Sequence, residues 1–238
     1  MRIFYKTNFY LIIRLFSFLF LALSFSAYSQ IPAGYYDNAM GREGEALREA
    51  LHYIIKDHTI VTYTSLWAHF QSTDKKSNGK VWCMYSDKPG LQPNYEYSFG
   101  SDQCGNYSGE GDCYNREHSW PESWYGDNGT PMKTDLFHVY PTDGYVNSQR
   151  GNHPFGEVGT VSWSAGNGGK LGVSNFPGWS GFTVFEPINE YKGDFARSYF
   201  YMVTRYYGQD SGWLDNEMIS GANIKDKPME MLLMWHNQ

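Results

Sequence analysis

The stretch Asp135-Leu-Phe-His-Val-Tyr-Pro-Thr-Asp-Gly-Tyr-Val-Asn-Ser-Gln-Arg-Gly-Asn152 concentrates polar side chains that are capable of chemistry. A second stretch of the same character, Cys113-Tyr-Asn-Arg-Glu-His-Ser-Trp-Pro121, precedes it. Residues 122–134 join the two, and their Gly and Pro content and their length suit a link from a strand to a following hairpin and helix. Together these residues predict a small unit of strands and one helix that carries the function.

Glu117 and His118 are adjacent, and adjacent side chains on an extended strand point to opposite faces. Both can enter one site only if the strand bends. Pro121 follows closely and favours an end to the strand, where a bend is easiest. The sequence therefore predicts that the carboxylate and the imidazole meet at a bend.

A short helix is predicted after Pro141, with Thr142 as its N-cap residue. In such a helix Asn147 and Arg150 are three positions apart and share one face. The amide and the guanidinium would then join the carboxylate and the imidazole of the preceding strand. We therefore expect one site that contains four different polar groups.

The first 29 residues have the layout of a secretory signal peptide. Residues 1–14 carry three basic residues and no acidic residue, and residues 15–25 are almost entirely apolar. Small residues stand three and one positions before a cut at Gln30, as in cleaved signal peptides. The apolar run is shorter than the ~20 residues of a membrane-spanning helix. The mature chain, residues 30–238, is expected to be secreted or periplasmic, without a membrane anchor.

The composition of the mature chain limits its class. Without residues 1–29, 16 Lys and Arg remain against 25 Asp and Glu, a net charge of −9. A net negative charge does not by itself indicate nucleic-acid binding, but a local basic cleft can still bind phosphate on an acidic protein. The length suits one domain with a sizeable core. An aromatic content of 18 % and 25 glycines favour a compact, loop-rich α+β fold.

Apolar periodicity predicts further elements. Glu43 to His58 repeats apolar residues on one helical face, which should pack in the core. Asp194 to Tyr207 has Asp194 as a good N-cap and a glycine stop behind it, and a last helix should begin at Pro228. A short helix over 65–70, a strand over 79–85 and an irregular loop region over 86–111 complete the pattern. No internal repeat or linker divides the chain, so we predict a single domain over residues 30–238.

Three cysteines, Cys83, Cys104 and Cys113, lie in the mature chain, and export favours an oxidised pair. Cys104 and Cys113 bracket a Gly-rich loop that is flexible enough to let their sulfur atoms meet. We therefore expect this disulfide and a free, buried Cys83. Closing so short a loop is worth roughly 2 to 3 kcal/mol on the chain-entropy model. A Cys-based zinc site is the alternative, but no C-x-x-C spacing supports it.

At these residues the sequence resembles the bacterial endonuclease I family of secreted and periplasmic nucleases, within the His-Me finger (ββα-metal) group. Asn-Arg-Glu-His with a following Trp-Pro, and Asp-Leu-x-His-x-x-Pro running on to Val-Asn-x-x-Arg-x-Asn, are the family's two core blocks. Phe185-Glu-Pro followed by Lys192 to Tyr201 also looks like the family, so the resemblance covers most of residues 35–238. Family members continue past the segment similar to 228–237, which implies a C-terminally truncated member that stops at Gln238.

The resemblance implies that His118 is the general base and that Glu117 and Asn147 bind one Mg²⁺, or Mn²⁺ or Ca²⁺ in its place. A small set of hard oxygen ligands leaves Mg²⁺ several positions for water and phosphate oxygens. A metal ion at the leaving oxygen would offset charge as the P–O bond breaks. A neutral imidazole, with an unperturbed pKa near ~6.5, is suited to take a proton from the attacking water.

The implied activity is largely sequence-nonspecific, endonucleolytic hydrolysis of phosphodiester bonds by a monomer, with the choice between DNA and RNA left open. Arg150 has two interpretations, a bidentate contact with the scissile phosphate or an ion pair with an acid. His138 is expected to brace the unit by hydrogen bonds. Three cations could touch the nucleic-acid backbone, although a solvated surface or a salt bridge is the default for each: Arg116, Lys133 and Arg197.

A secreted carbohydrate-binding or adhesion module is the alternative from another class, since 8 Trp and 20 Tyr could provide sugar-stacking platforms. Such a module needs no cluster of Glu117, His118 and Asn147, and it would not turn over plasmid DNA with metal. A zinc protease is a second enzymatic alternative, but its H-E-x-x-H signature is absent from the sequence. Metal-dependent turnover therefore discriminates between these classes.

Overall fold

The structure is a computed structural model that describes residues 31–126 and 129–238. These residues combine helices with small antiparallel sheets, which confirms the predicted α+β class. The predicted signal peptide, residues 1–29, lies outside the described residues. The chain divides into two units, Met1–Asp37 and Asn38–Gln238, and all elements from α2 to α6 belong to the second unit.

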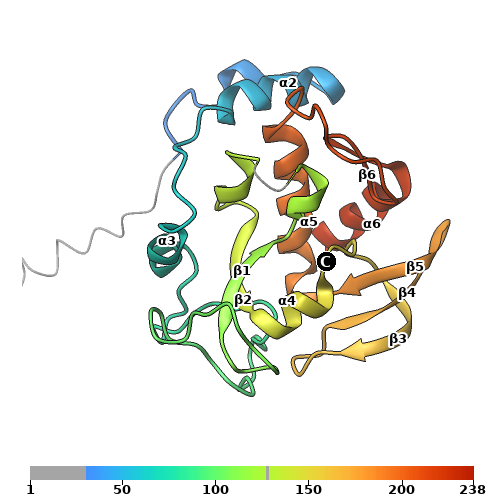
Figure 1. The fold of residues 1–238 in the computed structure, drawn as a ribbon. Coiled ribbons are helices and arrows are strands. Elements are labelled where there is room, and N and C mark those ends of the chain that lie inside the picture. Colours follow the sequence, from blue (N-terminus) through green and yellow to red (C-terminus); the bar gives the residue numbers. More distant parts are fainter. Residues whose placement is uncertain (1–30, 127–128) are drawn as a thin grey trace, which may run out of the picture. The chain divides into compact units, whose positions relative to one another are not determined.

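An antiparallel strand pair followed by a helix forms the part of the fold that the two polar stretches predict. β1 (Tyr114–His118) pairs with β2 (Val139–Asp143), and α4 (Gly144–Arg150) begins directly after β2 (Figure 1). The connection from β1 to β2 contains two short 3-10 helices, η2 (Glu122–Trp124) and η3 (Met132–Thr134). The predicted order of strand, connection, strand and helix is therefore observed.

Asp143 caps α4, and not the predicted Thr142. One carboxylate oxygen of Asp143 accepts the Val146 amide at 2.9 Å, which satisfies one of the amides that a helix start leaves without an intrahelical partner. Thr142 is still a ladder residue of β2, where it pairs with Asn115. The helix prediction is thus confirmed, and the predicted cap is wrong by one residue.

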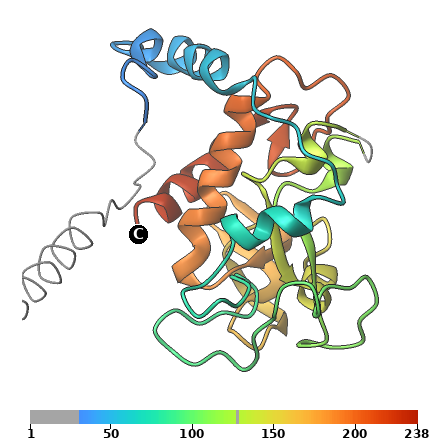
Figure 2. The same cartoon turned by 90° about the vertical axis from the view of Figure 1, so that its left-hand side faces the viewer.

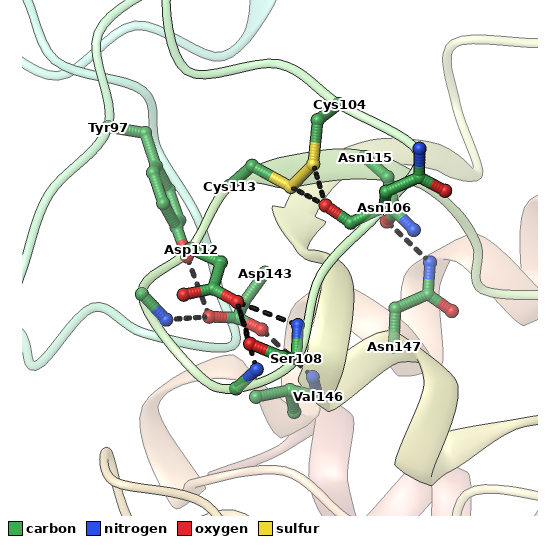
Figure 3. Close-up of a disulfide and its surroundings, with 12 residues drawn as sticks. Tyr97, Cys104, Asn106, Ser108, Asp112, Cys113, Asn115, Asp143, Val146 and Asn147 are labelled. Atoms are coloured by element: carbon green, nitrogen blue, oxygen red, sulfur yellow. Dashed lines mark hydrogen bonds between the residues drawn. A yellow bond between two sulfur atoms is a disulfide. The ribbon is translucent and has the colours of Figure 1, made fainter.

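The same Asp143 carboxylate anchors the loop region over 86–111. Its second oxygen accepts hydrogen bonds from the Tyr95 hydroxyl at 2.7 Å, the Tyr97 hydroxyl at 2.6 Å and the Gly111 amide at 2.9 Å (Figure 3). The side chain is completely buried, and these bonds offset the cost of removing a carboxylate from water. One residue therefore fixes both the loop and the start of α4.

Cys104 and Cys113 form a disulfide at the end of this loop (Figure 3), and Cys83 is free and buried. The Gly-rich loop predicted the same pair. The Cys83 sulfur accepts the Asp143 amide at 3.1 Å, and burial raises the pKa of the thiol to about 11. A thiol that stays protonated at neutral pH is a poor nucleophile and metal ligand, so Cys83 has a packing role.

A three-stranded antiparallel sheet was not predicted from the sequence. It contains β3 (Val158–Ser164), β4 (Lys170–Phe176) and β5 (Trp179–Glu186), in the order β3-β4-β5. Glycines and short polar residues interrupt the apolar alternation that normally marks such strands. At Gly172 a Cβ would lie 2.1 Å from the carbonyl oxygen of Thr160, so the close approach of β4 to β3 requires glycine.

The second unit contains helices near all the predicted positions. α2 (Gly44–Ile55) and α3 (Leu66–Thr73) confirm the two N-terminal helices. α6 (Asp226–His236) begins two residues before the predicted start, and a small strand pair, β6 (Ile219–Ser220) and β7 (Asn223–Ile224), precedes it. A short 3-10 helix, η1 (Asp37–Ala39), lies at the boundary between the units.

α5 (Asn189–Arg205) begins five residues before its predicted N-cap, Asp194. Its apolar stripe extends backward along the chain, because Tyr191 is buried as well as Phe195 and Tyr199. Tertiary packing of an apolar face provides most of a helix's stability in proteins. The helix therefore starts where its buried face starts, and a good capping residue inside it does not end it.

The predicted strand over 79–85 is not observed. In this segment Val81 forms an isolated β-bridge with Lys75. Residues 83–85 are all buried, so the alternation of a half-exposed strand is missing. The next two amides both bond to the carbonyl of Cys83, which turns the chain at once. The apolar run is thus a compact turn that fills the core.

Aromatic side chains of α5 connect the β1–β2 pair with the rest of the core. The ring of Phe195 packs on Phe155 with centroids 4.4 Å apart, and Tyr199 packs on Trp120 at 5.2 Å. α6 lies beside α5 in both views (Figure 1, Figure 2). Full burial of a large apolar side chain stabilises a fold by ~1.5–3 kcal/mol.

Among the described residues, no helix is long and apolar enough to cross a membrane.

Candidate active site

The Glu117 carboxylate points into the protein and is 1 % exposed. Its Oε1 atom accepts hydrogen bonds from the Tyr85 hydroxyl at 2.8 Å and from Arg150 Nη1 at 2.9 Å. Within the described part of the chain, Oε2 accepts no hydrogen bond. Burial raises the pKa of Glu117 to about 6, although Arg150 and Tyr85 act in the opposite direction. One carboxylate oxygen is therefore committed to the protein and the other is available.

Arg150 is as buried as Glu117 and uses its guanidinium inside the protein. Besides the bond to Glu117, Nη1 donates to the carbonyl of His118 at 2.9 Å and Nη2 donates to that of Ser119 at 2.6 Å. Of the two sequence-based interpretations, this geometry matches the ion pair. Nη1 and Nη2 are thus engaged with Glu117 and the end of β1, whereas Nε has no hydrogen-bond partner among the described residues.

Asn147 lies on the same side of β1 as Glu117. Its Nδ2 atom donates to Asn115 Oδ1 at 2.8 Å and to the carbonyl of Arg116 at 3.4 Å. Asn115 and Glu117 are two residues apart on a strand and so share a face. Figure 3 shows the amide nitrogen of Asn147 turned toward Asn115 and its carbonyl oxygen turned away. That oxygen is the atom that could bind a metal ion.

The imidazole of His118 lies on the other side of β1. Its Nε2 atom is 3.0 Å from the carbonyl oxygen of Lys133, and its Nδ1 atom is 3.2 Å from Glu122 Oε1. A carbonyl only accepts hydrogen bonds, so Nε2 carries the hydrogen of the neutral ring and Nδ1 carries the lone pair. Burial, reinforced by the neighbouring His138, lowers the pKa of His118 below its usual range. The ring is therefore neutral at pH 7.

The predicted convergence of four groups is only half observed. Glu117 and Arg150 are in direct contact, and Asn147 lies on their side of β1, whereas the His118 ring lies on the other side. β1 keeps its pairing with β2 as far as His118 and Val139, so the alternation of an extended strand still applies to the last residue. The predicted bend between Glu117 and His118 was wrong for this reason.

Tyr63 lies beside His118 and was missed in the sequence. The two rings are nearly parallel, with planes at 20° and centroids 6.2 Å apart. The guanidinium of Arg116 lies 3.6 Å from the Tyr63 ring centroid and 4.4 Å from that of Trp67, and it donates to the Tyr63 carbonyl at 2.9 Å. No local pattern identifies Tyr63, because its place depends on how the segment before α3 packs on β1.

Glu122 was also missed, although its position four residues after His118 offered a signal. Its Oε2 atom pairs with Lys133 Nζ at 2.8 Å, while Oε1 faces the imidazole. Lys133 is also 5.0 Å from the Tyr63 ring. Two of the predicted nucleic-acid contacts, Arg116 and Lys133, therefore lie next to His118, where their charges face the same small region.

His138 lies beside His118, with ring centroids 5.8 Å apart, and Arg197 lies on α5. His138 is fully buried, and its Nε2 atom is 2.6 Å from the carbonyl of Met132, which agrees with a bracing role. Arg197 on α5 is 53 % exposed in its side chain and pairs with Asp194 at 2.5 Å. Arg197 is thus a surface cation that is paired with a residue of its own helix.

The available oxygen donors fit a hard divalent cation. In residues 31–126 and 129–238, no group of three or more His, Cys, Asp or Glu side chains is arranged to hold a metal ion. Glu117 Oε2 and Asn147 Oδ1 are nonetheless two oxygen donors on one side of β1. Two protein oxygens with the remaining positions left to water and phosphate match the preference of Mg²⁺.

Comparisons with known proteins place this chain in a family. A sequence model of the family described as Endonuclease I matches residues 43–238, so the chain belongs to the Endonuclease I family. Two curated relatives carry the name extracellular ribonuclease. One, from Bacillus subtilis (strain 168), is 33 % identical over 212 residues, and one, from Bacillus amyloliquefaciens, is 34 % identical over 212 residues. Each alignment covers 86 % of this chain, and the chain spans 65 % of the length of each relative.

Proposed function

We propose that this protein is an exported, metal-dependent endonuclease that hydrolyses phosphodiester bonds with His118 as the general base. The observation that carries the proposal is the position of His118 at the end of β1, with Nε2 held by a backbone carbonyl. With Nε2 engaged by that carbonyl, Nδ1, which lies 3.2 Å from Glu122 Oε1, is the ring atom that would take the proton as a general base. Family membership makes phosphodiester hydrolysis the reaction to assign to it.

Glu117 and Asn147 would hold the metal ion in this proposal. The bound ion supplies charge stabilisation at the phosphate as the P–O bond breaks. Arg150 holds Glu117 through Oε1, which fixes the orientation of Oε2. Glu117 and His118 are the last two residues of β1 and point to opposite sides, so a phosphate group would have to lie beyond the end of the strand to approach both. On this proposal β1 and α4 form a His-Me finger.

Arg116 and Lys133 would bind the phosphate backbone near His118. Both cations lie against Tyr63, and a concentration of positive charge on one surface binds a polyanion even when the whole protein is acidic. The negative charge of Glu122 is offset by Lys133. Contacts with phosphate carry no sequence information, so the cleavage should be largely sequence-tolerant.

The name of both relatives, extracellular ribonuclease, favours RNA as the substrate. DNA remains the substrate that the sequence resemblance implies. The relatives and the disulfide also support export, because disulfides persist in oxidising compartments outside the cytosol. We therefore propose a secreted or periplasmic enzyme that acts on RNA and DNA.

The test is incubation of the purified mature chain with RNA and with supercoiled plasmid, in Mg²⁺ or in excess EDTA. Cleavage should require Mg²⁺ and stop with EDTA. Asn147→Ala should lose activity at low Mg²⁺ and recover part of it at high Mg²⁺, since one metal ligand is missing while the base remains. Asn189→Ala, an exposed amide at the start of α5, is the matched control and should behave like the parent. Undiminished cleavage in EDTA would overturn the metal-dependent mechanism.

A further inference from the structure

Phe137 is a large aromatic side chain that remains in water just before the start of β2. It is 62 % exposed. Its ring lies on that of Tyr201 in α5, with planes at 28° and centroids 4.7 Å apart. A mostly exposed ring contributes little to the stability of the fold, because stabilisation follows the apolar area removed from water. Burial of apolar area therefore does not account for its position.

The pair of rings is held in place by one buried carboxylate. The Phe137 amide donates to Asp135 Oδ1 at 3.1 Å, and the Tyr201 hydroxyl donates to Asp135 Oδ2 at 2.9 Å. The carbonyl of Phe137 accepts the Tyr140 hydroxyl at 3.3 Å. Asp135 itself is 2 % exposed. The exposed ring is thus attached to a fixed backbone and backed by a fixed ring, which lowers the entropic cost of binding a flat ligand.

The surroundings of the pair suit a nucleic-acid strand. Phe137 is two residues before Val139, which lies opposite His118 in the β1–β2 pair. Arg197 is four residues before Tyr201 on α5, and residues with this spacing share a helix face. The aromatic pair is therefore linked along the chain to the residue that faces the candidate base, and along α5 to an exposed cation.

We propose that the outer face of Phe137 binds a nucleobase of a single-stranded nucleic acid by stacking. The inference rests on the proposed nuclease function and specifies the form of its substrate. Bases of a single strand can turn out and stack on aromatic side chains, whereas bases of a duplex are already stacked and paired. Arg197 would neutralise a phosphate of the same strand. Stacking requires only a flat π face, so this contact tolerates any base.

The experiment measures binding of short fluorescent oligonucleotides to the mature chain in EDTA. The probes are a single-stranded thymidine oligonucleotide, an abasic oligonucleotide of equal length and a duplex. Phe137→Ala should weaken binding of the single strand by roughly 5- to 150-fold, the range expected for one stacked base. Binding of the abasic strand and of the duplex should stay unchanged. Phe137→Trp should restore binding of the single strand.

Tyr53→Ala is the matched control, because Tyr53 on α2 is also 62 % exposed and is not part of the proposed surface. It should bind all three probes like the parent chain. Equal binding of the single strand by Phe137→Ala and the parent, or an equal loss on the abasic strand, would overturn the stacking proposal while leaving the nuclease proposal intact. A parent chain that neither binds nor cleaves any nucleic acid would overturn both.

Discussion

The two sides of β1 differ in how their polar groups are used. On the α4 side, Glu117 and Arg150 are each 1 % exposed and satisfy one another inside the protein. On the opposite side, His118 faces Glu122 and Lys133, whose side chains are 24 % and 26 % exposed. The first arrangement has little contact with solvent, whereas the second combines partly exposed charges with an imidazole.

This difference suggests a division of labour along one strand. Breaking a buried ion pair leaves a charge without its partner and destabilises the fold strongly, whereas breaking a partly exposed pair costs little. A substitution on the α4 side should therefore affect stability first, and a substitution on the His118 side should affect turnover first. The predictions below test that contrast.

The largest effect is expected for His118→Ala. Removal of a general base lowers turnover more than ground-state binding, here by a factor of roughly 10² to 10⁴. The measurement is the rate of plasmid and RNA cleavage at saturating Mg²⁺, with circular dichroism to verify folding. Nucleic-acid binding should stay near the parent level.

The exposed His236 at the end of α6 provides a control, since His236→Ala should cleave at the parent rate. A folded His118→Ala protein that also cleaves near the parent rate would disprove the proposed base. Loss of folding in His118→Ala would instead contradict the contrast between the two sides of β1.

The next effect is expected for Arg150→Met, on the other side. The substitution leaves Glu117 buried without its cation, which should lower the free energy of unfolding by about 3–5 kcal/mol. Urea denaturation followed by circular dichroism measures the change. Adding Glu117→Gln to Arg150→Met should recover part of the loss, because a neutral amide replaces the unpaired carboxylate.

Arg197→Met is the matched control for Arg150→Met, because Arg197 forms an exposed pair with Asp194. Its free energy of unfolding should change by less than about 1 kcal/mol. If Arg150→Met were as stable as the parent and had lost only activity, the phosphate-contact interpretation of Arg150 would replace the ion pair.

Local sequence signals predicted the elements but not how they meet. The strand, connection, strand and helix order from Cys113 to Asn152 follows from turn residues and caps, and so does the pairing of Cys104 with Cys113. The β3–β4–β5 sheet was missed because residues such as Gly172 are chosen for close backbone approach and carry no apolar signal. A sequence pattern of side chains does not reveal a close contact between two strands that requires a residue without a side chain.

The candidate site shows the same limit. Glu117, His118 and Asn147 are candidates from their own motifs, but the predicted meeting of Glu117 and His118 at a bend was wrong because β1 keeps its pairing to its last residue. Tyr63 and Phe137 were not identified, because Tyr63 reaches His118 through the packing of α3, and Phe137 is defined by its contact with Tyr201. Both contacts join segments that are distant in sequence.

Asp74 provides a second comparison with Glu117, since both are buried carboxylates. Asp74 follows α3 and is 3 % exposed. Its Oδ2 atom accepts the Thr73 hydroxyl at 2.6 Å, but among the described residues no Lys, Arg or His lies within ion-pair distance. Burial raises the pKa of Asp74 to about 7, opposed by the bond from Thr73. The pKa of Glu117, which is paired with Arg150, is raised less far above its ordinary value.

The smallest effect is therefore expected for Asp74→Asn, and it should depend on pH. The folded-state pKa of Asp74 lies above the unfolded value, so the folded state holds a proton that the unfolded state loses between about pH 4 and pH 7. Stability must fall as pH rises through this window. Asp74→Asn removes this dependence, so it should match the parent near pH 4 and be more stable than the parent at pH 8. Urea denaturation at several pH values measures the difference, with the exposed Asp57→Asn as control. A difference that does not change with pH would show that Asp74 is ionised in the folded protein despite its burial.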